Sequence, residues 1–143
     1  MRVDAIRLGL LGVCAAALAA CAAMEGKDTG PPPEPNLLPT NYKQEIIDTM
    51  IKVLPDPTNV RGALITDPFL SVAPGGREQR YIVCVRYDAR EVTRQYMGSK
   101  DRVGTFFAGH LNQLVEAGNE QCAKAAYKPF PELEKMCLAK KCD

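Results

Sequence analysis

Cysteine is the residue with the most specific chemistry in this 143-residue chain, which contains six cysteines and one histidine. Two of them, Cys14 and Cys21, lie in the apolar amino-terminal stretch LGVCAAALAAC. The other four are Cys84, Cys122, Cys137 and Cys142. A cysteine that follows a short apolar leader is a candidate for acylation, whereas cysteines of an exported domain are candidates for disulfides. The surrounding residues decide which chemistry each cysteine serves.

Residues 1–20 have the organisation of a secretory signal peptide. The first seven residues are basic overall, and an uninterrupted apolar run follows from Leu8 to Ala20. This run is shorter than the roughly 20 apolar residues that a membrane-spanning helix needs. A basic start, a short apolar core and a small-residue exit are typical of a leader that is cleaved. We therefore predict that the domain is exported.

The residues Leu18-Ala19-Ala20-Cys21 resemble the bacterial lipobox, in which an aliphatic and two small residues precede the cysteine. The resemblance implies that the Cys21 thiol receives a diacylglycerol and becomes the acylated amino terminus after cleavage. Cys14 follows the β-branched Val13, where the motif has a small residue, so it is expected to leave with the signal. Several acyl chains together anchor a protein stably, at about 0.8 kcal/mol per buried methylene.

These features predict a lipid-anchored protein of the bacterial cell envelope. Ala22, rather than aspartate, follows the anchor. By analogy with the sorting rule of enteric bacteria, Ala22 favours the outer membrane, with the protein facing the periplasm. The expected contact with the membrane is made through the lipid on Cys21.

The composition changes sharply after the anchor. Residues 21–39 hold the lipidated cysteine and a proline-rich stretch with no apolar periodicity, and they are predicted to be a flexible, disordered linker. Residues 40–143, roughly 100 residues, are expected to form a single small domain. Loss of residues 1–20 leaves 16 basic and 16 acidic residues. This balance argues against a nucleic-acid partner, which a basic surface would recruit.

The domain is predicted to be α+β, beginning with a helix. Apolar residues recur at helical spacing from Ile46 to Leu54, after Asn41 and Gln44, which have the spacing of a capping box. The two prolines at positions 55 and 57 are expected to end this helix, because proline lacks the amide donor and clashes with the preceding turn.

A small antiparallel sheet of 3–4 strands is expected next. Val60–Thr66 and Phe69–Val72 are predicted to be strands separated by a turn at Asp67-Pro68, and Arg80–Tyr87 is the clearest strand because it is rich in β-branched and aromatic residues. Residues 103–115 fit either a helix or a hairpin, and the Ala-Gly-His sequence in their middle favours the hairpin. Short carboxy-terminal helices are expected over 119–126 and 131–138.

The four downstream cysteines are expected to form disulfides in the oxidising periplasm. They allow three connectivities. Cys137 and Cys142 are close in sequence and easily joined, which leaves Cys84 to pair with Cys122. A zinc site built from these cysteines and His110 is the alternative, but it lacks a CxxC pair and the compartment removes free thiolates. We therefore predict no metal ligands.

A catalytic constellation is not visible. His110 lies beside a glycine turn and is expected at the surface, and neither Ser71 nor Ser99 lies in a GxSxG context. The glycines match neither a phosphate-binding loop nor a dinucleotide motif. We therefore expect no cofactor and no enzymatic activity.

Residues 77–102 contain seven basic and four acidic side chains with interleaved tyrosines. One interpretation is a surface that binds anionic envelope material or an envelope protein, since arginine suits phosphates and carboxylates. The other is a solvated sheet edge whose arginines pair with local carboxylates. The candidate binding residues are Arg80, Arg86, Tyr87, Arg90, Arg94 and Tyr96.

The lipobox, the proline-rich tether and the segments YIVCVRY (81–87), GHLNQ (109–113) and CAKAAYKPFPEL (122–133) resemble those of a group of small bacterial envelope lipoproteins with no assigned activity. The order of a helix and then a meander is also similar to small envelope-assembly lipoproteins of the BamE type, a likeness of fold only. We therefore expect a non-catalytic binding or scaffolding module. The alternative is a small hydrolase or ligand-binding protein with a pocket near His110 or near Arg86 and Tyr87.

Overall fold

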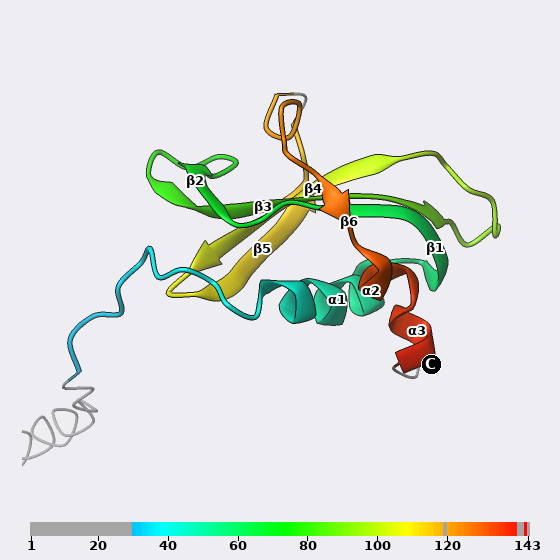
Figure 1. The fold of residues 1–143 in the computed structure, drawn as a ribbon, viewed down its shortest axis with the longest axis horizontal. Helices are drawn as coiled ribbons and strands as arrows, with labels where there is room; N and C mark the ends of the chain where they lie inside the picture. Colours follow the sequence, from blue (N-terminus) through cyan, green and yellow to red (C-terminus); the bar gives the residue numbers. More distant parts are fainter. Residues whose placement is uncertain (1–29, 119, 140–141, 143) are drawn as a thin grey trace, which may run out of the picture. The chain divides into compact units, whose positions relative to one another are not determined.

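A computed structural model describes residues 30–118, 120–139 and 142 (Figure 1). The predicted signal peptide, the lipidation site at Cys21 and the first part of the linker lie outside the described residues. Residues from Pro33 onward form one compact unit. Its sheet has six antiparallel strands, and its fold is mixed α+β, as predicted. The strands are β1 (Asp56–Ile65), β2 (Phe69–Val72), β3 (Gln79–Arg90), β4 (Lys100–Phe107), β5 (His110–Glu116) and β6 (Lys128–Pro129).

The strand order is β5-β4-β3-β1-β6, and β2 pairs with the first residues of β3. The expectation of 3–4 strands was too low, and β6 is the strand that was not predicted from the sequence. β6 contains only two residues, one of them a proline, so it has no sequence periodicity of its own. It exists because Lys128 and Pro129 pair with the end of β1. β1 also begins earlier than expected, at Asp56, and register shifts interrupt its pairing with β3.

The hairpin predicted within residues 103–115 is confirmed. β4 and β5 pair along their length and are joined by Ala108 and Gly109, whose φ angles are 50° and 80°. Two-residue hairpin turns that match the twist of a sheet need positive φ, which glycine adopts without strain. Gly104 packs under Leu111, where an added Cβ would lie 3.1 Å from the leucine side chain. Glycine is a poor helix former, and Gly104 instead permits close packing within the hairpin.

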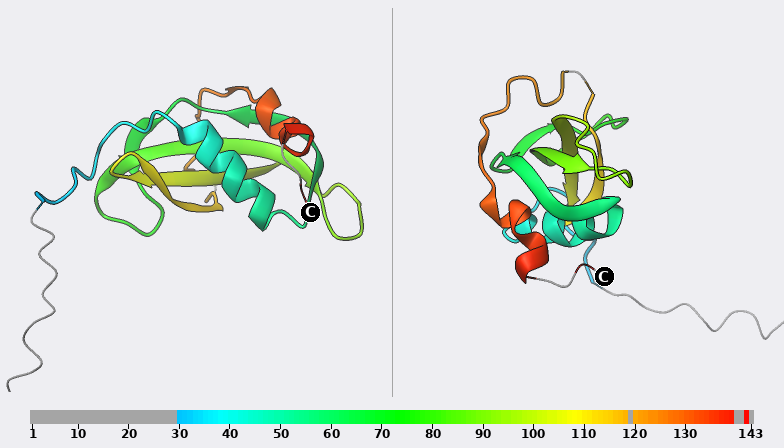
Figure 2. Two further views of the ribbon diagram at one scale, coloured as in Figure 1. Left: turned by 90° about the horizontal axis from the view of Figure 1, so that it is seen from below. Right: turned by 90° about the vertical axis from the view of Figure 1, so that its right-hand side faces the viewer.

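Helix α1 (Tyr42–Val53) crosses one face of the sheet (Figures 1 and 2). It buries Ile46, Ile47 and Met50 and ends at Val53, with Leu54 as its C-cap residue before the prolines. Asn41 is the N-cap residue, but the predicted capping box is absent because its side chain makes no cap hydrogen bond. The side chain of Gln44 instead donates to Asp48 at 2.9 Å.

Two short helices, α2 (Pro131–Glu134) and α3 (Met136–Ala139), follow β6. They lie within the region predicted to be helical, with Pro131 at the first helical position. The helix expected over 119–126 is wrong for its described residues, since 120–124 form turns and a bend and 125–126 are irregular. This segment is held by the sheet through Cys122 rather than by its own helical hydrogen bonds.

The two faces of the sheet are covered differently. All three helices pack on one face, where the main core includes Val83, Val85, Phe106, Phe130 and Leu133. The opposite face carries a smaller core under the segment that follows β5, formed by Ile82, Cys84, Val103 and Cys122. Alternation along β3 explains this arrangement, because successive side chains of a strand point to opposite faces.

Candidate functional site

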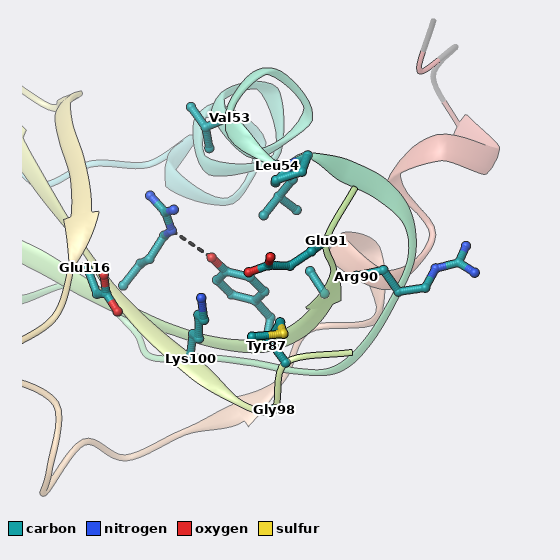
Figure 3. Close-up of a pocket in the computed structure, with 12 residues that line it drawn as sticks. Val53, Leu54, Tyr87, Arg90, Glu91, Gly98, Lys100 and Glu116 are labelled. Atoms are coloured by element: carbon teal, nitrogen blue, oxygen red, sulfur yellow. Dashed lines mark hydrogen bonds between the residues drawn. The ribbon is translucent and has the colours of Figure 1, made fainter. Parts of the chain in front are cut away.

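A pocket of about 200 Å³ opens at the end of the sheet where β3 ends and β4 begins (Figure 3). Its wall is built from the carboxyl end of α1, the β3–β4 connection and the last residue of β5. It is more enclosed than two other hollows of the domain, whose volumes are about 570 and 500 Å³. The lining residues are Val53, Leu54, Pro55, Tyr87, Ala89, Arg90, Glu91, Met97, Gly98, Lys100, Arg102 and Glu116.

Tyr87 forms the floor of this pocket (Figure 3). Its position in β3 points it to the helix-covered face, where it is only 2% exposed. Its hydroxyl accepts a hydrogen bond from Nε of Arg102 at 2.7 Å. Arg102 comes from the neighbouring strand β4, and its guanidinium also lies 3.4 Å from the carbonyl oxygen of Leu114 in β5. Side chains of two strands and the backbone of a third therefore fix the floor.

Charges of both signs surround the mouth. Lys100 and Glu91 extend toward the ring of Tyr87, and Glu116 lies on the β5 side (Figure 3). Among the residues that the structure describes, these three side chains form no ion pair with one another or with a neighbour. They are therefore available for an incoming ligand or partner.

Apolar side chains complete the rim. Val53 and Met97 are substantially exposed there, with Met97 at 57%. An unbranched thioether adapts its shape easily, so methionine is common at surfaces that receive a partner. A buried aromatic floor, an apolar rim and free charges at the mouth together suit the docking of one amphipathic side chain.

The loop that forms one wall is fastened at several points. The Tyr96 hydroxyl donates to the carbonyl oxygen of Asn59 at 2.7 Å, and the Arg61 guanidinium lies 3.6 Å from the centre of the Tyr96 ring. Asp88 accepts hydrogen bonds from the amide of Gly98 at 3.1 Å and from Nε of Arg61 at 2.8 Å. These contacts hold the wall in place although most of the loop is exposed.

The structure does not bring the six predicted binding residues together. Tyr87 lies on the helix-covered face, whereas Arg86 lies on the opposite face. Arg80 is at the other end of β3, where it pairs with Glu78 and lies over the ring of Phe107. Arg90 pairs with Asp56 at 3.1 Å. Arg80, Arg90 and Arg86, which pairs with Asp101, therefore each have a carboxylate partner. Arg86 and Arg90 find theirs on the strands on either side of β3, which is a central strand of the sheet and not an edge.

Arg94 and Tyr96 lie in the loop between β3 and β4. Arg94 has a positive φ of 61° and an exposed side chain. Tyr96 lies between Arg61 and Arg90, whose guanidinium is 5.9 Å from its ring centre. Of the six candidates, Tyr87 and Arg90 line the pocket. The side chain of Arg90 points away from it (Figure 3).

Arg86 and Asp101 form a two-pronged pair across β3 and β4, with N–O distances of 2.6 and 2.8 Å. The Arg86 hydrogen bonds hold the pKa of Asp101 below its ordinary value. The Arg86 guanidinium also lies 4.6 Å from the centre of the Tyr127 ring. Burial, followed by the charge of Asp101, raises the pKa of Tyr127 to about 12. This cluster attaches the segment after β5 to the sheet.

His110 lies at the surface, with 82% of its side chain accessible. Its Nδ1 lies 3.1 Å from Oε1 of Glu45, and the other oxygen of that carboxylate accepts the amide of Leu111. Glu45 therefore fastens α1 to the start of β5. None of the three hollows includes His110 among its lining residues.

Sequence reasoning missed most of the pocket. Val53, Met97 and Glu116 had no distinguishing local pattern, and Lys100 was one of seven basic residues in a charged stretch. The available signal was the run of polar residues between two strong strands, which marks a loop able to carry function.

Comparisons with protein-family models, with curated proteins and with solved structures found no match to this chain. Within the described residues, no helix is long and apolar enough to cross a membrane. The same residues contain no group of three or more potential metal ligands of the histidine, cysteine or carboxylate type.

Proposed function

We propose that this protein is a lipid-anchored, non-catalytic binding module of the bacterial envelope, attached through Cys21. The observation that carries the anchor is the sequence Leu18-Ala19-Ala20-Cys21 behind a short apolar leader. The disulfides Cys84–Cys122 and Cys137–Cys142 support this assignment, because disulfides persist in the periplasm and are rare in the cytosol. In this proposal the domain faces the periplasm from the outer membrane.

The anchor is tested by comparing the native chain with Cys21→Ser. Mass spectrometry of the native protein should find an acylated amino-terminal cysteine, and the protein should sediment with membranes. The Cys21→Ser chain should lack the acyl mass. An unmodified native Cys21 would overturn the anchor. Cys14→Ser is the matched control, because its acylation and cleavage should equal those of the native chain.

The pocket over Tyr87 supports a binding role rather than turnover of a metabolite. Sites for small molecules generally have volumes of about 300–1,000 Å³. The pocket measures about 200 Å³, which is room for one side chain rather than for a substrate with attacking and leaving groups. Its charged mouth and apolar rim suit a protein partner that inserts a single anchoring residue.

A crosslinking experiment tests this role in cells. A photoreactive residue replaces Met97 at the pocket rim or, as a control, the exposed Leu138 of α3. We expect one envelope protein to be captured from position 97, and Lys100→Glu in the same chain should reduce that capture at least several-fold. Equal capture from both positions, or capture unaffected by Lys100→Glu, would assign the pocket no role in binding.

A further inference from the structure

We propose that the opposite end of the sheet, where the chain enters the domain, docks onto the surface of the lipid bilayer. This inference rests on the proposed lipid anchor and adds a second, non-covalent contact to it. We call this part the entry end. It consists of residues 33–39, β2, the loop 73–78 and the β4–β5 turn with Phe107.

Topology places these segments together. β2 pairs with the first residues of β3, and the last residues of β4 pair with that same part of β3 (Figures 1 and 2). The loop 73–78 and Phe107 line one open hollow. The amide of Ala108 donates to the carbonyl oxygen of Pro35 at 3.1 Å, and Leu37 packs against Gly109. The entering segment is therefore fixed on the β4–β5 turn.

The entry end exposes large apolar side chains from residues 33–39, from β2 and from the end of β4. Exposed fractions are 54% for Leu37, 53% for Leu38, 48% for Leu70, 48% for Val72 and 41% for Phe107. Single exposed apolar residues are ordinary on a protein surface, but a group at one end indicates a contact with another apolar phase. Arg77 adds one exposed cation that suits a lipid surface, while Arg80, which lies over the Phe107 ring, is paired with Glu78 of the loop 73–78.

The position of the anchor selects the bilayer as the occupant. Only residues 22–32 separate Cys21 from Pro33, the first residue of the compact unit. Even fully extended, the chain from Cys21 to Pro33 spans no more than about 43 Å. Anchoring makes membrane contact by the entry end an intramolecular event, so weak affinity is sufficient for docking. Amphipathic helices that lie on a membrane bury their apolar side chains at the headgroup boundary, and we expect the apolar side chains of the entry end to reach the same depth.

Docking in this way has a consequence for the pocket. The pocket lies at the end of β3 and the start of β4, whereas the entry end lies at the start of β3 and the end of β4. A bilayer at the entry end therefore leaves the pocket facing away from the membrane and open to a periplasmic partner.

Tryptophan fluorescence tests the docking directly, because the chain contains no tryptophan. The native acylated protein is purified, its acyl mass is verified, and it is reconstituted into phosphatidylethanolamine–phosphatidylglycerol vesicles with or without brominated acyl chains. Phe107→Trp and Leu38→Trp report on the entry end. Val92→Trp is the matched control, because Val92 is 81% exposed in the loop between the end of β3 and the start of β4, opposite to the entry end.

We expect the bromines to quench the fluorescence of the Phe107→Trp and Leu38→Trp chains several-fold more than that of the Val92→Trp chain, at every protein-to-lipid ratio. Equal quenching in all three variants, each verified as acylated, would overturn the docking and leave the anchor intact. A spectral shift that rises with the protein-to-lipid ratio without bromine quenching would assign this end to a second copy. Absence of the acyl mass would instead overturn the anchor. Leu38→Trp keeps the test valid should Phe107→Trp fail to fold.

Discussion

Cys84 and Cys122 form a disulfide that joins the centre of β3 to the segment after β5, with their Cα atoms 5.9 Å apart. Cys84 is fully buried and Cys122 nearly so, within the smaller core. The disulfide therefore does more than close a loop. It holds a segment that has few backbone hydrogen bonds of its own against a face of the sheet that no helix covers.

Loss of the Cys84–Cys122 disulfide is expected to destabilise the domain more than loss of the Cys137–Cys142 disulfide. Replacing both Cys84 and Cys122 by alanine should lower the free energy of unfolding by about 4 kcal/mol in the chain-entropy model. Replacing Cys137 and Cys142 should cost about 2 kcal/mol, because that loop is short. Denaturant titration of both variants checks the order. A larger loss from the second pair would contradict the role assigned to the first.

The Tyr87 hydroxyl is expected to position Arg102 at the pocket. Tyr87→Phe removes the acceptor of the Arg102 Nε–H and should lower stability by about 1 kcal/mol. It should also weaken crosslinking from position 97 without changing the fold. Tyr81→Phe, in the same strand and on the same face, is the control. If both variants crosslink as the native chain does, the hydroxyl has no part in binding.

Glu45 is expected to fasten α1 to β5 through the amide of Leu111. Glu45→Ala leaves that amide without its acceptor and should cost about 1–2 kcal/mol of unfolding free energy. Glu45→Gln retains a side-chain oxygen and should recover part of the loss. Thermal denaturation, with the exposed Glu120→Ala as a control, measures both effects. A loss in the glutamine variant equal to that in the alanine variant would rule out this acceptor role.

Tyr96 is expected to keep the pocket wall ordered. Tyr96→Ala removes the hydrogen bond to Asn59 and the stacking on Arg61, so the loop should open more often. Amide exchange at Gly98, whose N–H is held by Asp88, should accelerate several-fold, whereas exchange at Val83 in the centre of β3 should change little. Unchanged exchange at Gly98 would show that Asp88 alone holds the loop.

The Arg86–Asp101 pair predicts a pH dependence of stability. Arg86 lowers the pKa of Asp101 in the folded state from its ordinary value of 3.8. At a pH near 3.8 the Asp101 carboxylate of the unfolded chain therefore binds more protons than that of the folded chain. The contribution is present above that value and is lost as the pH falls through the lower pKa of the folded state.

Asp101→Asn should remove this part of the acid sensitivity and, at neutral pH, lower stability by at most about 1 kcal/mol, since both side chains are partly exposed. Urea titrations of the native and Asp101→Asn chains at pH 3 and pH 7 measure it. An identical pH dependence in the two chains would contradict the pairing.

Local pattern was sufficient for several features of this protein. Gly109 between two apolar runs favoured the hairpin of β4 and β5, although the apolar spacing also fitted a helix. Pro131 at the start of α2 follows from the fixed φ of proline. The burial of the middle of β3 follows from the β-branched residues Ile82, Val83 and Val85. Backbone preference and side-chain periodicity determine these features over a few residues, so they can be predicted without tertiary contacts.

Tertiary structure alone decided what those elements bring together. β6 forms only because β1 offers an edge, and the pocket combines Val53 of α1, Tyr87 of β3 and Glu116 of β5, which are distant in the sequence. The partners of Arg86 and Arg90 are also distant in the sequence. Arg86 pairs with Asp101 of β4 and Arg90 pairs with Asp56 of β1, each directly across from it in the sheet. Strand order and register set these distances, and no short stretch of sequence encodes them.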